Sequence, residues 1–474
     1  MERKNAWNTY DGKELQRLAE VTEDYKRFLS EAKTERECAA LAVKMAEKKG
    51  YRSLEAIQKE GRTLRAGDKV YAVHKKKLVV LYHMGERTME EGLNILGAHI
   101  DSPRLDLKQN PLYEEGEMAL LDTHYYGGIK KYQWAAIPLA LHGVIVKKDG
   151  TSVELSVGER PEDPVVGISD LLIHLSAEQM QKKAAVVVEG ENLNIIAGSR
   201  PLSDVETDGE DPEKKEKDKI KAALLKLLKE RYGVEEEDFL SAELEAVPAG
   251  PARDFGLDGS MVMGYGQDDR ICAFTSLLAF LEAETPLYTS VCLLTDKEEI
   301  GSMGATGMQS RYFENITAEV MELAGGYSEL ALKRCLQRSH MLSSDVSAAF
   351  DPNYASAFEK KNAAYLGRGM VFNKYTGSRG KSGSNDACAE YMGALRRIMD
   401  GAGVCWQTAE LGKVDQGGGG TIAYITANYG MDVIDSGVAL LNMHSPWEVS
   451  SKADIYEAYK GYRAFLQAGW QEEA

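Results

Sequence analysis

The stretch LNILGAHI (93–100) decides the architecture of this chain. It is a short apolar run that ends near a histidine, as expected of a strand buried inside an α/β sheet. Open α/β sheets carry their functional side chains just beyond the ends of such strands. We therefore predict a buried strand here, with His99 at its end and with Asp101, two residues on, placed to orient the imidazole ring.

Four further segments carry carboxylates or a histidine at the ends of predicted elements. They read GQDDR (266–270), DKEEIGS (296–302), SSDVS (343–347) and NMHSPWE (442–448). Carboxylate oxygens and imidazole nitrogens are ligands of zinc and related divalent ions. Together with His99, these segments can hold two metals and leave one carboxylate free. A two-metal hydrolase uses such a set of groups to share a water and to polarise a carbonyl.

Each segment has an ordinary explanation when it is taken alone. Asp268 and Asp269 are adjacent, so one of them bridges two metals, or the pair caps the helix that follows. Glu298 and Glu299 come after the predicted strand SVCLLTD (290–296) and point in different directions. One can therefore bind a metal while the other acts as general base; the alternative is a pair of surface glutamates. The occurrence of all five segments in this order favours a metal site.

A glycine run adds a candidate substrate contact. DQGGGGT (415–421) lets a substrate pass close to the backbone, and its N–H groups are able to cradle an anion. We expect Gly418 and Gly419 to contact the substrate. Other catalytic motifs are absent: the sequence has no HExxH and no GxSxG, and GKS (380–382) lacks the leading glycine of a phosphate loop.

The composition narrows the class of protein. A chain of 474 residues is too long for one compact core and predicts two domains. The formal net charge of −17 argues against nucleic-acid binding, which needs clustered Lys and Arg. The sequence has no signal-peptide pattern, no apolar run long enough for a membrane span and no CxxC pair. We therefore expect a cytoplasmic protein with no membrane contact and no disulfide framework.

The pattern of the chain changes twice. Two amphipathic helices within 10–50 and a hairpin at 69–82 precede the first motif. Short β-like runs then dominate, followed within 204–234 by a charge run that we expect to be solvated and by an amphipathic helix. An α/β pattern returns after that. The predicted domains are therefore one catalytic domain made of 1–103 and 255–474, and a β-rich insertion, 104–254.

In order and wording, the motifs resemble those of the M18 metallo-aminopeptidases, the family of aspartyl aminopeptidase and yeast vacuolar aminopeptidase I. The bacterial members are the most similar, and the resemblance covers almost the full chain. The specific blocks are GAHIDSPRLDLK, KEEIGSMGATG, SSDVSAAFDPNY and MHSPWEVSSKADI, whereas GQDDR is a looser match. The resemblance implies an α/β fold: a phosphorylase/hydrolase-like three-layer catalytic domain, interrupted by a β-rich inserted dimerisation domain. It also implies a tetrahedral homododecamer with interior active sites.

The resemblance further implies roles for individual residues. One metal resembles a site made by His99, Asp268 and Asp345. The other resembles a site made by Asp268, Glu299 and His444, so that Asp268 bridges the two metals. Glu298 takes the place of the general acid/base, and Asp101 supports His99.

Two more positions follow from the aspartyl members of the family. Their inserted domain carries a histidine that reaches the neighbouring subunit's site, and His174 in LLIHLS stands at that place. They also use a lysine to read an acidic substrate side chain, for which Lys374 in VFNKYTG is the candidate. The segment that follows, TGSRGKSGSND, departs from theirs, so the resemblance does not extend to acidic specificity.

The sequence thus predicts a cytoplasmic aminopeptidase with two divalent metals per subunit, zinc in the first place, with cobalt or manganese as substitutes. Peptides are the expected substrates, and the preferred N-terminal residue stays open. Two alternatives remain: a two-metal deacylase of N-acyl amino acids, and an oligomeric shell without catalytic activity. The intact base Glu298 argues against the second.

Overall fold

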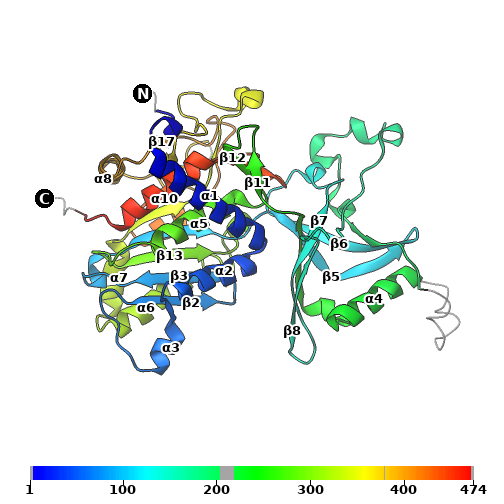
Figure 1. The fold of residues 1–474 in the computed structure, drawn as a ribbon, viewed down its shortest axis with the longest axis horizontal. Helices are drawn as coiled ribbons and strands as arrows, with labels where there is room; N and C mark the ends of the chain where they lie inside the picture. Colours follow the sequence, from blue (N-terminus) through cyan, green and yellow to red (C-terminus); the bar gives the residue numbers. More distant parts are fainter. Residues whose placement is uncertain (1–3, 203–217, 378, 471–474) are drawn as a thin grey trace. The chain divides into compact units, whose positions relative to one another are not determined.

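The computed structural model describes residues 4–202, 218–377 and 379–470. The chain divides into two compact units. The α/β unit comprises Met1–Ser102, Ala252–Met443 and Trp447–Ala474; the insertion comprises Pro103–Pro251 together with His444–Pro446. Both ends of the chain therefore contribute to one unit (Figure 1).

A mixed nine-stranded sheet forms the centre of the α/β unit. In spatial order its strands are β1 (Arg52–Ser53), β2 (Lys69–His74), β3 (Leu78–His83), β13 (Ser290–Thr295), β4 (Asn94–His99), β14 (His340–Ser344), β18 (Asp432–Gly437), β16 (Met370–Asn373) and β17 (Trp406–Thr408). Strand β4 pairs in parallel with β13 on one side and with β14 on the other, and every residue of β4 is buried. The strand predicted at 93–100 is therefore present in the middle of the sheet.

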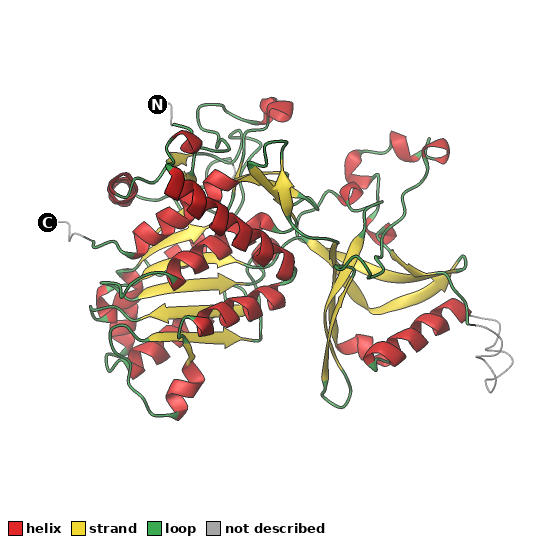
Figure 2. Ribbon diagram, viewed as in Figure 1, coloured by secondary structure: helices red, strands yellow, loops and turns green. Residues whose placement is uncertain are grey.

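Helices cover both faces of this sheet and complete a three-layer architecture (Figures 1 and 2). One face packs against α1 (Gly12–Glu31), α2 (Glu35–Lys48), α5 (Gln267–Leu281), α8 (Ala389–Gly401) and α10 (Lys452–Leu466). The other face packs against α3 (Leu54–Lys59), α6 (Tyr312–Leu323), α7 (Glu329–Gln337) and α9 (Ala423–Ala427). Successive strand residues point to opposite faces: in β13, Cys292 joins the first core and Val291 the second. The predicted three-layer fold is confirmed.

The amino-terminal elements form as their local sequence predicts. Helix α2 begins after Thr34, whose hydroxyl accepts the N–H of Glu37, and the Glu37 carboxylate accepts the N–H of Thr34 in return. The hairpin of β2 and β3 turns at Lys75 and Lys76, both of which have positive φ.

A second, five-stranded sheet of the α/β unit brings several motifs together. Its strands are β11 (Arg253–Phe255), β12 (Met261–Gly264), β20 (Glu448–Ser451), β19 (Ala439–Leu441) and β15 (Ser347–Ala348). GQDDR follows β12, SSDVS enters β15, and NMHSPWE connects β19 to β20. Three of the five motifs thus lie at the ends of short strands of one sheet.

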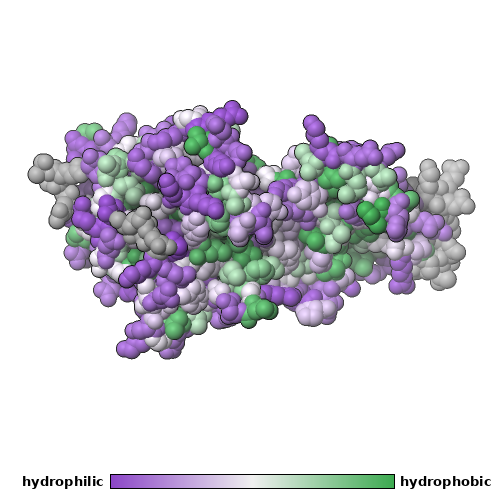
Figure 3. Space-filling view, turned by 90° about the horizontal axis from the view of Figure 1, so that it is seen from above, coloured by the Kyte–Doolittle hydropathy of each residue, from purple (hydrophilic) through white to green (hydrophobic). Residues whose placement is uncertain are grey.

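The insertion contains a six-stranded antiparallel sheet with the order β8 (Ser152–Val157), β7 (Leu139–Val146), β10 (Ala242–Pro248), β5 (Arg104–Glu115), β6 (Met118–Tyr126) and β9 (Ile195–Gly198). Helix α4 (Lys219–Tyr232) contributes Leu228 to a small core with Ile145 and Leu244. It is the amphipathic helix predicted after the charge run. Most of the charge run itself lies outside the described residues. On the face drawn in Figure 3, hydrophobic side chains reach the surface among hydrophilic ones.

Two further predictions concern cysteines and membranes. All six cysteines fall within the described residues and are free thiols. Among the helices described, none combines the length and the apolar character needed to cross a bilayer.

Candidate metal centre

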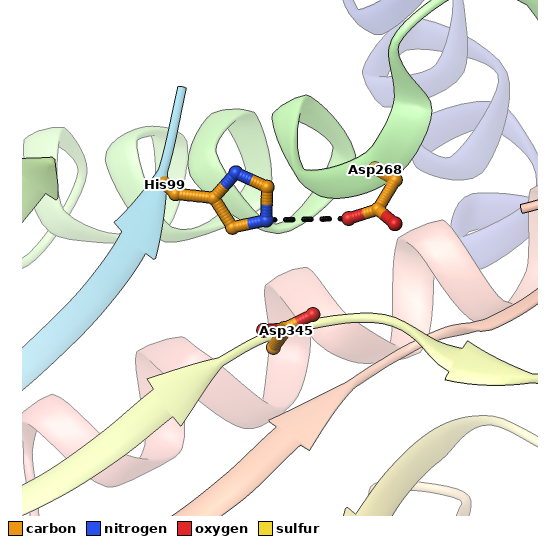
Figure 4. A group of neighbouring side chains, drawn as sticks. All are labelled: His99, Asp268 and Asp345. Carbon is orange, nitrogen blue, oxygen red and sulfur yellow. Dashed lines mark ion pairs between the residues drawn. The ribbon is translucent and has the colours of Figure 1, made fainter. Parts of the chain in front are cut away.

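Three side chains from three elements converge beyond the end of strand β4 (Figure 4). His99 is the last residue of β4, Asp345 follows β14, and Asp268 lies at the start of α5. His99 Nε2 lies 3.2 Å from Asp268 Oδ1. One ligand atom from each of the three residues lies within 4.8 Å of the others. This geometry suits a divalent ion held by one imidazole and two carboxylates.

Backbone contacts fix the two aspartates of this group. The Asp345 N–H donates to the carbonyl oxygen of Ser436 on the neighbouring strand β18, at 3.1 Å. The Asp268 carbonyl oxygen accepts a hydrogen bond from the Ser102 hydroxyl at 2.7 Å. The backbone N–H of Asp268 donates to Glu448 Oε2 at 3.1 Å. The ligand-bearing turns are therefore held by direct hydrogen bonds to other segments of the α/β unit.

A second group joins His99 to Glu298 and Glu299. Both glutamates belong to a single 3₁₀ turn, Glu298–Ile300, which begins shortly after the end of β13 at Thr295. Asp101 holds this turn, because its Oδ1 accepts the N–H of Glu298 at 3.1 Å and its Oδ2 accepts the N–H of Glu299 at 3.2 Å. Asp101 Oδ1 also lies 3.4 Å from His99 Nδ1. Asp101 thus lies beside the imidazole and also accepts the N–H groups of both glutamates.

The electrostatics of the group favour a bound cation. Desolvation, followed by the charge of nearby Asp269, holds the pKa of Asp345 well above its usual range. Burial opposes protonation of His99, but the hydrogen bonds to Asp101 and Asp268 outweigh it and hold its pKa well above the usual value. Clustered carboxylates with one imidazole as counter-charge are stabilised when a divalent cation is present. All the candidate donors are oxygen or nitrogen atoms, as a zinc site of this type requires.

Asp269 does not belong to the metal group, although its sequence position left that open. It is fully buried, and its carboxylate lies beside the Cys272 thiol. Desolvation raises the pKa of Asp269 well above its usual range. Of the two adjacent aspartates, Asp268 is the one whose carboxylate faces His99.

Three predicted residues have not yet been described: His444, His174 and Lys374. His444 lies in the connection between β19 and β20, in the segment that groups with the insertion, and its Nδ1 is 2.8 Å from the carbonyl oxygen of Gly128. His174 is exposed in the turn Ile173–Leu175. Lys374 Nζ lies 3.0 Å from Asp386 Oδ1, and both side chains are nearly half exposed.

The glycine run forms part of a small cavity of about 150 Å³ in the α/β unit. Gly418 lines this cavity together with Tyr375 and Arg379, and the Gly419 N–H donates to the Thr376 carbonyl oxygen at 2.9 Å. Within the described part of the chain, the residues that line this cavity do not include the metal group. The role of the two glycines as substrate contacts therefore stays a prediction.

Sequence reasoning missed the residues that hold the ligands in place. Gln267 is fully buried; its side-chain oxygen accepts the hydroxyl of Ser450 at 2.6 Å, and its amide donates to the Glu448 carbonyl oxygen at 2.6 Å. Together with Ser102, Gln267 and Glu448 fix the turn that carries Asp268. Their position in the sequence could have indicated this role, because each lies inside a motif and within a few residues of a predicted ligand.

Comparisons with known proteins identify the family of this chain. The family model described as aminopeptidase I zinc metalloprotease (M18) matches residues 28–466. A probable M18 family aminopeptidase 1 of Clostridium acetobutylicum is 62% identical over 465 residues, which is 98% of each chain. The crystal structure of an M18 aminopeptidase from Thermotoga maritima has a TM-score of 0.92 at 45% identity and covers 98% of this chain and 99% of its own.

A more distant structure shares the fold alone. The S. cerevisiae mApe1 dodecamer has a TM-score of 0.74 at 19% identity, with 94% of this chain and 96% of that chain covered. The family match over most of the chain confirms the resemblance inferred from the motifs. The chain belongs to the M18 family of zinc metalloproteases and is an aminopeptidase.

Proposed function

We propose that this aminopeptidase works with two zinc ions per subunit that share a bridging water. The first ligand set is His99, Asp268 and Asp345; the second is Asp268, Glu299 and His444. The convergence of His99, Asp268 and Asp345 is the observation that carries the proposal, since one oxygen or nitrogen of each lies within 4.8 Å of the others.

The second ligand set is supported by the local connections of its members. Glu299 shares a metal-binding group with His99 and is held by Asp101 through its N–H. His444 precedes Glu448 by four residues, and Glu448 Oε2 accepts the N–H of Asp268. The connection that carries His444 therefore ends beside the bridging aspartate.

In the proposed reaction the amino terminus of a peptide binds at the metals. Bound zinc supplies Lewis acidity toward the scissile carbonyl and lowers the pKa of a bound water. Glu298 takes the proton of the attacking water and delivers it to the leaving amine. Its backbone is fixed by Asp101, and its side chain is 14% exposed, so the carboxylate is both positioned and accessible to water.

Metal removal tests this proposal. Chelation should abolish hydrolysis of Leu-p-nitroanilide, and zinc, cobalt or manganese should restore it, because the donors do not select strongly among these ions. Elemental analysis of the active enzyme should give about two metals per subunit. An active preparation with less than about one metal per subunit contradicts the two-metal mechanism.

A deacylase of N-acyl amino acids uses the same metal chemistry but needs no place for a free amine. Comparing Leu-p-nitroanilide with N-acetyl-leucine separates the two activities. We expect turnover of the nitroanilide alone. A rate survey over Asp, Glu, Leu, Lys and Met nitroanilides then identifies the preferred N-terminal residue. A shell without catalytic activity predicts no hydrolysis of any of these compounds with any added metal.

We further propose that the enzyme is a cytoplasmic homo-oligomer, a tetrahedral dodecamer, in which the insertion makes contacts between subunits. The insertion exposes a run of apolar side chains around His174: Leu171, Leu172, Ile173 and Leu175. Apolar surface of this kind is typical of protein–protein contacts. A distant relative of the same fold has been solved as a dodecamer. Light scattering that shows an active monomer contradicts this part of the proposal.

A mixing experiment tests whether His174 acts across a subunit interface. In this proposal, subunits with Glu298→Gln and subunits with His174→Ala each lose most of their activity. After dissociation and joint reassembly, some sites pair an intact Glu298 with a neighbour's intact His174, and part of the activity should return. If reassembly is verified and no activity returns, His174 acts at the site of its own subunit or has only a structural role.

A further inference from the structure

A buried aspartate outside the metal group connects three segments of the α/β unit. Asp435 lies on β18, is 2% exposed and is opposite Ser343 in the parallel pairing of β18 with β14. Its Oδ1 accepts the hydroxyl of Ser343 at 2.9 Å and the hydroxyl of Thr421 at 2.7 Å. One carboxylate oxygen therefore ties two strands and the loop that ends at Thr421.

The two donors belong to segments for which we have proposed functions. Ser343 lies two residues before Asp345, on the strand that leads to the metal group. Thr421 directly follows the four glycines 417–420. The Thr421 hydroxyl oxygen also accepts the N–H of Ala423 at 3.2 Å, so its own hydrogen is available for Asp435. This arrangement anchors the carboxyl end of the glycine run.

Glycines alone cannot hold this loop, because they offer no side chain to pack and allow the backbone wide conformational freedom. Among the described residues, one anchor is the hydrogen bond from the Gly419 N–H to the Thr376 carbonyl oxygen. Another is the hydrogen bond from the Thr421 hydroxyl to Asp435. The anchor at Asp435 differs from the first because it leads directly to the strand of a proposed metal ligand.

The fold itself does not require a carboxylate at this place. The neighbours of Asp435 on β18 include Val433 and Ile434, which are buried apolar residues. A buried carboxylate is costly unless hydrogen bonds compensate it. Burial raises the pKa of Asp435 to about 6, while the bonds from Thr421 and Ser343 act in the opposite direction. An apolar residue would fill this buried position without the desolvation free energy that a carboxylate requires. We therefore infer that the carboxylate has a role beyond packing.

We propose that Asp435 is a positioning residue that fixes the glycine loop 417–421 relative to the strand carrying Asp345. The inference rests on the proposed function, in which Gly418 and Gly419 meet the substrate backbone. Its consequence is a division of effects: loss of the anchor weakens substrate binding and leaves the metals and the base in place.

Paired variants separate the two hydrogen bonds of Asp435. Thr421→Val removes the loop anchor and keeps the bond to Ser343, whereas Ser343→Ala does the reverse. We expect Thr421→Val to raise KM for Leu-p-nitroanilide by roughly 10-fold, the order of one hydrogen bond to a charged group, with kcat nearly unchanged. Ser343→Ala should leave KM near the wild-type value. Asp435→Asn keeps an acceptor oxygen and should rescue most of the KM effect seen with Asp435→Ala.

A readout without turnover keeps this test independent of the proposed reaction. Hydrogen exchange of the 415–421 amides should speed up in Thr421→Val and Asp435→Ala but not in Ser343→Ala, with metal content unchanged in all of them. Wild-type KM together with wild-type exchange in Thr421→Val overturns the inference. Equal KM effects in Thr421→Val and Ser343→Ala also overturn it, since they indicate a general loss of structure. If the wild-type enzyme fails to hydrolyse any nitroanilide, the proposed function fails, and the exchange data still decide the anchor.

Discussion

Asp101 and Glu298 are joined by a hydrogen bond in which the backbone N–H of Glu298 donates to Asp101 Oδ1 at 3.1 Å. The same carboxylate accepts the N–H of Glu299 and lies beside His99. Asp101 is fully buried, so these bonds do not compete with bulk water. The geometry of the proposed base is therefore set by a residue from a distant part of the chain, which also contacts a proposed metal ligand.

Replacing Asp101 by Asn should lower kcat by roughly 10- to 100-fold, because the amide offers one acceptor oxygen where the carboxylate offers two, and bonds to a charged acceptor are the stronger kind. The rate is measured at saturating metal, since support of a ligand histidine also affects metal affinity. Asp454→Asn is the matched control: Asp454 is buried and accepts the N–H groups of Gly367 and Gly369 at 2.8 and 2.7 Å. The control should lose stability and keep kcat. Equal losses of kcat in both variants contradict a specific role of Asp101.

Glu298→Gln keeps the shape of the side chain and removes the proton acceptor. We expect kcat to fall by roughly 10²- to 10⁴-fold, the range for loss of a general base. Metal content should stay unchanged, whereas Asp345→Ala should lose metal. Kinetics and elemental analysis of both variants check this. A near-normal kcat in Glu298→Gln means that the roles of Glu298 and Glu299 are exchanged or wrong.

Asp386→Ala should shift specificity toward acidic N-terminal residues. Asp386 pairs with both Lys374 and Lys381, at 3.0 and 2.8 Å, and its removal leaves two lysine charges uncompensated. Because the pairs are largely exposed, we expect only a few-fold rise in kcat/KM for Asp- and Glu-nitroanilides relative to Leu-nitroanilide. Asp24→Ala, which breaks a surface pair with Arg27 on α1, is the control. An unchanged ratio shows that Lys374 does not face the substrate side chain.

The pH dependence of stability should change in Asp435→Asn. The folded-state pKa of Asp435 is raised from 3.8 to about 6, so the folded protein holds this proton more tightly than the unfolded chain. The wild-type protein should therefore lose stability relative to the variant as pH rises from about 4 to about 6, by about 3 kcal/mol in total. Urea unfolding of both proteins across this range measures the difference. If the difference in unfolding free energy between the two proteins stays constant over this pH range, Asp435 does not titrate with a raised pKa in the folded protein.

Local sequence determined the elements and the chemical types of the site. The apolar run before His99 favours a buried strand, because strands covered on both faces carry short, nearly continuous apolar sequences. Thr34 and Glu37 specify the start of α2 through their own hydrogen bonds. The motifs also supply the donors of the metal group, since oxygen and nitrogen ligands are recognisable as residue types.

Tertiary structure alone decided which partner each of these side chains meets. Asp268 rather than Asp269 faces His99, although the two are adjacent, and Lys374 meets Asp386. Asp101 holds Glu298 from 197 positions away, and Asp435 joins Ser343 to Thr421. Such contacts depend on strand order and register in the two sheets of the α/β unit. These follow from the packing of the whole core and not from the few residues around each side chain.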